Sequence, residues 1–249
     1  MNGITLSRMG GGIGLGRQQR IVPLLPAPDA PVVIADFAND VYKINGATVT
    51  MADVVEDRSD VWEAFHADYI EPGVGLAARP TSLGNNRQTA PALTAAAATG
   101  LTPFEGGFTG LFDYRFEGTT TDTGDAMSFI VQMIDDPAWT NQINFFHSAA
   151  DGGGSVWDFS GTSGKIDSGA GPNHKLALTL TASLAAFSID GGPVAHYVPG
   201  TPAILDMNLI GFYVHATSAS VLDQLALLRS AQFYAPVMES VLPTMSALA

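Results

Sequence analysis

The stretch Lys175–Ala195, KLALTLTASLAAFSIDGGPVA, decides the fold of this chain. Apolar residues alternate with polar or small residues across Lys175–Thr181, and a second apolar run, Ala185–Ile189, follows a small-residue break. This period of two, closed by Asp-Gly-Gly at 190–192, predicts two antiparallel strands and a tight turn. The strand pair carries no catalytic pattern, so residues that indicate a function must lie elsewhere in the chain.

The same alternation continues on both sides of this strand pair and indicates a mainly β chain. Gly, Asp and Pro clusters separate the runs, and about eight short strands with such punctuation predict a sandwich or jelly roll. The final run, 221–228, is also compatible with a helix, because its period is weak. The further predicted strands are Phe108–Phe116, Met127–Ile134, Gln142–His147, Val156–Phe159, Leu205–Val214 and Val221–Leu228.

Changes in composition divide the chain into three parts. Residues 1–31 form a Gly- and Pro-rich arm, residues 32–94 a small lead-in and connector, and residues 95–249 the sandwich with a helical tail. In the lead-in, Asn45-Gly46 predicts a two-residue hairpin turn and Thr50 opens a short helix. We expect 80–103 to be an irregular connector and 230–245 to hold the terminal helix.

The arm has too little apolar surface to fold by itself, since its glycines give freedom and its prolines give stiffness. Its cations are Arg8, Arg17 and Arg20, and no acidic residue precedes Asp29. Because the remainder is acidic, this asymmetry predicts that the arm attaches the protein to an acidic neighbour.

Charge and composition exclude several functions. The net charge is −13 and only 14% of residues are charged, without a basic stripe, so we expect no nucleic-acid partner and no attraction to anionic lipids. The absence of cysteine excludes disulfides and cysteine zinc sites. We expect no signal peptide and no membrane insertion, since no apolar stretch is long enough. The low charge favours a homo-oligomer.

The quoted stretch resembles the centre of concanavalin A-like lectin/glucanase (LamG-like) domains. The resemblance also runs through 107–116, 129–134, 143–146 and 222–228, roughly residues 95–235, and is similar to the versions carried by tailed bacteriophages. The lead-in "IADFANDVYKINGATVTMADVV" resembles the opening of phage fibre and spike proteins and of gene-transfer-agent head fibres. The resemblance implies a virion localisation and a jelly-roll sandwich projecting from a phage-like particle. The arm would bind other virion proteins.

Glucanase relatives of this fold place their carboxylates on alternate residues of one strand. The nearest stretch here holds Asp113 and Glu117 on one predicted face, with Arg115 between them. Four residues of strand span about 13 Å, too far for a retaining pair of carboxylates. We therefore interpret the stretch as a surface ladder in which Arg115 pairs with its acidic neighbours, and we expect no catalytic residue and no enzyme.

Metal binding rests on one loop. Asp135, Asp136 and Asn141 lie together in the sequence and offer oxygen ligands suited to calcium, although Asp-Asp-Pro is better explained as a turn. We predict no other cofactor. The histidines form no His-x-x-x-His pair, and we interpret them as isolated strand or surface residues; they are His66, His147, His174, His196 and His215.

Sugar binding requires an aromatic platform beside polar groups, and two tryptophans are suitable. We predict a site at Trp139, Asn141, Asn144, Trp157 and Asp158, where indole would stack on a sugar ring and amides or carboxylates would take the hydroxyls. Packing in the core is the alternative for both tryptophans, and it is the more common role of this residue. The ligand would be host surface polysaccharide. Two alternatives stay open: a purely structural decoration or neck protein, and a polysaccharide hydrolase with an unrecognised carboxylate pair.

Overall fold

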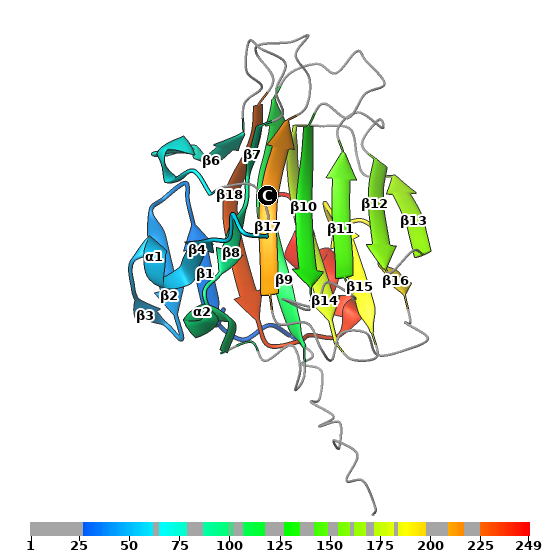
Figure 1. Ribbon diagram of the computed structural model, residues 1–249. Helices are drawn as coiled ribbons and strands as arrows, with labels where there is room; N and C mark the ends of the chain where they lie inside the picture. Colours follow the sequence, from blue (N-terminus) through cyan, green and yellow to red (C-terminus); the bar gives the residue numbers. More distant parts are fainter. Residues whose placement is uncertain are drawn as a thin grey trace, which may run out of the picture.

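The alternating runs become two antiparallel sheets packed face to face in the computed structural model (Figure 1). This architecture confirms the prediction of a mainly β sandwich. The structure describes residues 27–61, 65–78, 87–99, 101, 107–117, 127–134, 142–148, 154–159, 162–167, 172–181, 184–197, 209–216 and 225–249.

The larger sheet contains ten strands within the described residues. Its long central strands pair antiparallel over eight or more residues, with β9 between β14 and β18. In spatial order the main path is β16 (Ala195–Tyr197), β15 (Ala185–Ile189), β14 (Asn173–Leu180), β9 (Phe108–Glu117), β18 (Leu225–Tyr234), β1 (Val33–Asp36), β2 (Val41–Ile44) and β3 (Ala47–Thr48), with β5 (Ile70–Glu71) and β6 (Gly75–Ala78) joined to it through β18.

The second sheet contains eight strands in the part of the chain that the structure describes, and it faces the viewer in Figure 1. Its centre is β10, which pairs with β11 on one side and β17 on the other. The order is β13 (Thr162–Asp167), β12 (Gly154–Phe159), β11 (Gln142–Ser148), β10 (Met127–Ile134), β17 (Leu209–Ala216), β8 (Pro91–Leu93) and β4 (Val55–Asp57), with β7 (Arg87–Thr89) paired to β17.

The core between the sheets is built on phenylalanine rings. Phe112 and Phe233 from the ten-stranded sheet meet Phe129 and Phe212 from the other, with ring centroids 5.3–6.1 Å from Phe112. All four side chains are fully buried. Burial of each such side chain stabilises the fold by about 1.5–3 kcal/mol, so this quartet ties the two sheets together.

The lead-in contributes strands to both sheets. The predicted hairpin forms around Asn45 and Gly46, whose φ values of 51° and 79° are those of a two-residue turn. Helix α1 (Met51–Val54) follows, and Asp53 accepts hydrogen bonds from the backbone N–H and the hydroxyl of Thr50 at 2.8 and 2.6 Å. This capping box satisfies helix donors that would otherwise lack partners.

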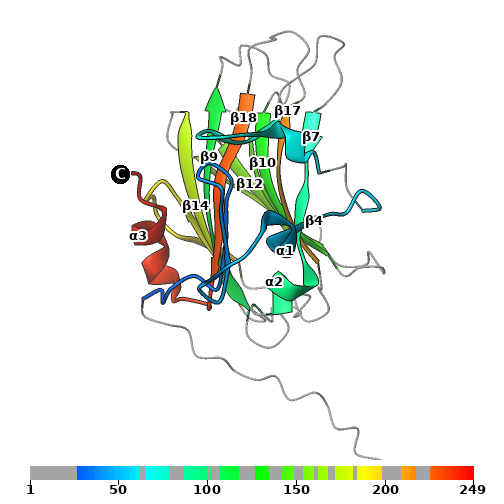
Figure 2. The same ribbon diagram turned by 90° about the vertical axis from the view of Figure 1, so that its left-hand side faces the viewer.

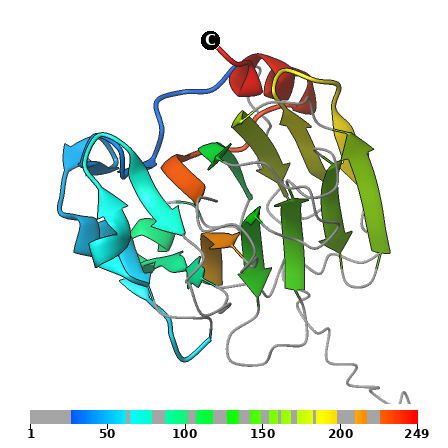
Figure 3. The ribbon, with the colours of Figure 1, turned by 90° about the horizontal axis from the view of Figure 1, so that it is seen from above.

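The C-terminal segment covers the outer face of the ten-stranded sheet. There α3 (Leu242–Ser246), preceded by the 3-10 turn η3 (Glu239–Val241), lies against β14 and β15 on the side away from the eight-stranded sheet (Figures 2 and 3). Ala177 and Ala186 of the sheet pack with Val237 and Leu242. The small alanines on the sheet leave the room that the helix needs.

Two predicted elements differ from the structure, and one strand was not predicted. The connector 80–103 contains β7, β8 and helix α2 (Ala95–Thr99), because Thr94 accepts a hydrogen bond from the Ala97 N–H at 3.1 Å and caps the helix. Residues 230–234 continue β18 rather than start a terminal helix, whereas the strand predicted at 221–228 is confirmed over 225–228. Strand β13 was not predicted, since TSGKID lacks a clear apolar alternation.

Candidate functional site

A row of polar residues crosses the outer face of the eight-stranded sheet. The strand registers place Gln132 of β10 opposite Asn144 of β11, Asn144 opposite Asp158 of β12, and Asp158 opposite Ser163 of β13. Opposed residues of antiparallel strands share a face of the sheet. We call these four positions the polar row; at about 4.8 Å per strand spacing, it extends for about 14 Å.

Burial of the alternate positions shows which face this is. Val131 and Phe145, the chain neighbours of Gln132 and Asn144, are 1% and 2% exposed and belong to the core between the sheets. Successive residues of a strand point to opposite faces, so the polar row lies on the outer face. Helix α3 lies on the other sheet (Figure 2), and Gln132 is only half-buried.

A second row lies two residues further along β10, β11 and β12, about 7 Å away, and continues onto β17. Its members share large apolar side chains, and two are aromatic. The registers align Ile130 with Phe146 and Tyr213, and Phe146 with Val156. We call these four positions the apolar row, and the polar and apolar rows together the front face.

Such a surface has the two chemical elements that a sugar requires. Aromatic rings offer broad apolar area against the C–H face of a pyranose, and amide and carboxylate groups take its hydroxyls in hydrogen bonds. The two rows run side by side across three strands, β10, β11 and β12. This is the form expected of a platform for an extended chain rather than a closed pocket for a small molecule.

The structure separates the predicted sugar-site residues. Asn144 and Asp158 are brought directly opposite each other. Trp157, in contrast, is aligned with Phe145, which is buried against Phe187 of β15, so its position belongs to the core face. Trp139 and Asn141 lie outside the described residues.

The remaining predicted sites lie outside the described part of the chain. This applies to the calcium candidates Asp135, Asp136 and Asn141, and to the attachment residues Arg8, Arg17 and Arg20. Among the described residues no group of three or more His, Asp or Glu side chains is arranged to hold a metal ion. No described helix is long and apolar enough to cross a membrane.

Sequence reasoning missed Gln132, Phe146 and Tyr213. The signal was present within strands, because Asn144 and Phe146 are two residues apart and therefore share a face. The sequence could not provide the register between strands. Only the register shows that position 132 lies opposite 144 and that position 130 lies opposite 213.

Two of the histidines interpreted as isolated lie together in the core. The ring centroids of His147 on β11 and His174 on β14 are 4.6 Å apart, with the rings nearly perpendicular. The hydroxyl of Tyr114 is 2.6 Å from His147 Nδ1, and His174 Nδ1 is 2.8 Å from Asp190 Oδ2. The interpretation of scattered histidines was therefore wrong for this pair. We call these four residues the buried histidine cluster.

The carboxyl of Asp113 lies on the outer face of the ten-stranded sheet, remote from the front face. Its Cα is opposite those of Lys175 on β14 and Ser230 on β18. Burial raises the pKa of Asp113, and the positive charges of Arg229 and Lys175 offset part of that rise. The cations that act on Asp113 thus come from the neighbouring strands β18 and β14.

Comparisons with known proteins establish the fold. No family model and no curated protein matches the chain. Crh5 transglycosylase in its apo form superposes with a TM-score of 0.53 at 10% identity, over 91% of this chain and 95% of that chain. Its complex with NAG gives a TM-score of 0.50 at 10% identity, over 88% and 89%.

The GH43 protein BlXynB of Bacillus licheniformis gives a TM-score of 0.50 at 12% identity, over 81% of this chain. This chain covers only 39% of BlXynB. The fold is a mainly antiparallel β-sandwich, compatible with the concanavalin A-like architecture that the sequence resemblance implied. At such low identities the likeness shows the fold, and the function has to be argued from this chain's own residues.

Proposed function

We propose that this protein is a non-enzymatic glycan-binding module that holds polysaccharide on its front face. The observation that carries the proposal is the alignment of Gln132, Asn144 and Asp158 in one row beside Phe146 and Tyr213. A fold shared with a transglycosylase that was solved in complex with NAG is consistent with this function.

The charge pattern of the front face supports binding without hydrolysis. A retaining hydrolase needs two carboxyl groups about 5–5.5 Å apart. Within the described strands, the positions opposite Asp158 are Asn144 and Ser163, and its neighbours on β13 include Lys165. Asp167 is four residues along from Ser163, about 13 Å away. The described front face therefore offers Asp158 no catalytic partner.

A screen against immobilised polysaccharides tests this proposal. The purified chain is applied to neutral, acidic and amino-sugar polymers, and reducing-sugar release is measured on the same samples. We expect retention on at least one polymer without release of reducing ends. Release of reducing ends would favour the hydrolase alternative. Absence of binding to every polymer by a folded protein would overturn the proposal and leave the purely structural alternative.

Placement of this module on a phage-like particle is a further part of the proposal. It is supported by the composition of the arm, with Arg8, Arg17 and Arg20 preceding any acidic residue. Weak contacts of single copies would then be multiplied by the many copies on one particle. Deletion of residues 1–31 should abolish incorporation into particles and leave glycan retention intact. Incorporation of the shortened chain would contradict this role of the arm.

A further inference from the structure

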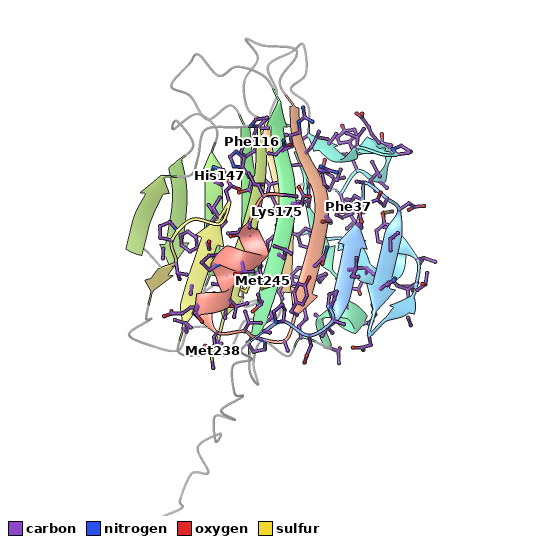
Figure 4. The ribbon with its side chains drawn as sticks, turned by 180° about the vertical axis from the view of Figure 1, so that it is seen from behind. Phe37, Phe116, His147, Lys175, Met238 and Met245 are labelled. Atoms are coloured by element: carbon purple, nitrogen blue, oxygen red, sulfur yellow. The ribbon has the colours of Figure 1, made fainter. Side chains whose placement is uncertain are left out.

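The buried histidine cluster connects the two sheets behind the front face. Tyr114 and His174 come from β9 and β14 of the ten-stranded sheet, whereas His147 comes from β11 of the other sheet. Tyr114 and His147 are fully buried, and His174 is 2% exposed. In Figure 4, His147 and Phe116 lie above Lys175, whereas Met238 lies below it.

The direction of the Tyr114–His147 hydrogen bond is argued from the protonation of Tyr114 and from the rings around its hydroxyl. Desolvation raises the pKa of Tyr114 well above 10, so its hydroxyl keeps its proton at neutral pH. Asp190, a short distance away, adds to this effect. We assign the phenolic O–H as donor to His147 Nδ1 at 2.6 Å, so His147 is the neutral tautomer with its hydrogen on Nε2.

A proton added to His147 is incompatible with this arrangement. Both ring nitrogens would then be donors, and the Tyr114 hydroxyl would have to turn its hydrogen away. Around that hydroxyl the rings of Phe116 and Phe129 offer no acceptor. A buried cation would also stand 4.6 Å from the ring of His174.

The groups that face His147 come from every described element packed against it. These are Tyr114 on β9, His174 on β14, and Asp190 in the turn after β15, which accepts from His174 and from the Lys175 N–H at 2.8 Å. On its own sheet, the positions beside it are Phe129 and Ser155. Of these residues, His147 is the one that lies on β11.

We propose that Tyr114 and His147 are positioning residues for the front face, and that protonation of His147 weakens glycan binding in acid. The proposal rests on the proposed function. His147 is next to Phe146 and three residues from Asn144 on β11, so loss of its bond to the other sheet shifts both front-face positions together. Neutral His147 therefore holds β11 in the binding register.

The test compares two amides at position 147 in the full-length protein. His147→Asn places a neutral acceptor close to Nδ1 and keeps the bond to Tyr114, whereas His147→Gln places its amide near Nε2 and leaves Tyr114 without an acceptor. Binding to the polymer retained in the screen is measured from about pH 7.5 to 5, above the range near 4 in which exposed carboxylates titrate.

We expect the wild-type affinity to fall towards the acid end of this range, because protonation of His147 removes the acceptor of the Tyr114 hydroxyl. His147→Asn should bind within about threefold of wild type at pH 7.5 and lose the acid dependence, because that bond is conserved. His147→Gln should bind weakly at every pH. An acid step in His147→Asn equal to that of the wild type would overturn the proposal.

A second measurement needs neither a variant nor a ligand. NMR titration of the wild-type protein follows the imidazole nitrogens of His147 and the backbone amides of Asn144 and Phe146. We expect Nδ1 to be unprotonated at neutral pH, and these amides to shift together with protonation of the ring. If the amides of Asn144 and Phe146 do not shift with protonation of the His147 ring, the positioning role is refuted, even if the protein binds glycan. Because this titration uses no glycan, it tests the positioning role separately from the proposed function.

Discussion

Asn144 and Asp158 occupy directly opposed positions on β11 and β12, although fourteen residues separate them in the sequence. Gln132 continues the same row on β10. This relationship places three groups able to bind sugar hydroxyls on one outer face of the sandwich. It also distinguishes them from Trp157, whose position belongs to the opposite face.

The first prediction concerns Trp157. Its alignment with the buried Phe145 implies that Trp157→Ala creates a core cavity and lowers the free energy of unfolding by about 3–5 kcal/mol. Urea denaturation measures this loss. Trp157→Phe should recover most of the stability. A Trp157→Ala protein that keeps its stability but loses glycan binding would restore the tryptophan platform that the sequence suggested.

The second prediction concerns two glycines with similar backbone conformation. Gly107 has φ of 86°, and a Cβ there would overlap the carbonyl oxygen of Leu180. Gly73 has a φ of 79°, and no atom lies within 4 Å of the position that a Cβ would take there. Gly73→Ala should cost about 1–2 kcal/mol from the left-handed backbone alone, and Gly107→Ala clearly more, above about 3 kcal/mol. Thermal or urea unfolding compares them; equal losses would contradict the close packing at Gly107.

The third prediction concerns the attachment of the C-terminal segment. The Thr109 hydroxyl is 2.6 Å from that of Thr179 and accepts a hydrogen bond from the Val237 N–H at 3.0 Å. Thr109→Val leaves two buried groups unsatisfied and should cost about 1–3 kcal/mol. Thr179→Val, the matched control, keeps the bond to Val237 and should cost less.

Hydrogen exchange at Val237 separates these two variants. Exchange should accelerate in Thr109→Val and remain close to wild type in Thr179→Val, because only the first change removes the acceptor of that amide. Equal acceleration in both variants would show that the segment is held by the apolar packing of α3 rather than by this bond.

The fourth prediction uses two carboxyl groups whose pKa values move in opposite directions. Burial raises the pKa of Asp113, so in the range between its unfolded and folded values stability falls as pH rises, and the cost persists at pH 7. Hydrogen bonds from Thr50 lower the pKa of Asp53, so its contribution is present at pH 7 and is lost as pH falls.

Asp113→Asn should therefore stabilise the protein at pH 7, by less than about 1 kcal/mol because the site is partly exposed. Asp53→Asn should destabilise it at pH 7. Both differences should shrink as pH falls towards 2.5, because protonation removes the charge that distinguishes aspartate from asparagine. Urea unfolding at the two pH values measures them, and a destabilised Asp113→Asn would show that its cations outweigh its burial.

The sequence predicted the positions of the strands better than it predicted which strands pair. Alternation located β9, β10, β15 and the Asn45-Gly46 hairpin, because strand period and turn chemistry are local properties. It did not locate β13, whose small and polar residues carry no apolar period. Strand β18 was ambiguous in the sequence, and its pairing with β9 and β1 decides its conformation.

The candidate site depended on pairing still more strongly. Asn144 and Asp158 were selected because they lie near tryptophans in the sequence, yet the structure joins them to Gln132 and places Trp157 elsewhere. His147 and His174 meet across the two sheets, a contact between residues on separate strands that spacing along the chain could not reveal. Register and sheet packing are long-range properties, and they determine both groups.

The most direct test of the central claim is the affinity of front-face variants for the polymer retained in the screen, measured by calorimetry at pH 7.5. Asn144→Ala should weaken binding about three- to tenfold and Asp158→Ala about ten- to a hundredfold, as expected for neutral and charged hydrogen bonds. Asn173→Ala, an exposed change on the other sheet, should leave it unchanged. Unaltered affinity in folded Asn144→Ala and Asp158→Ala proteins would contradict a glycan site on the front face.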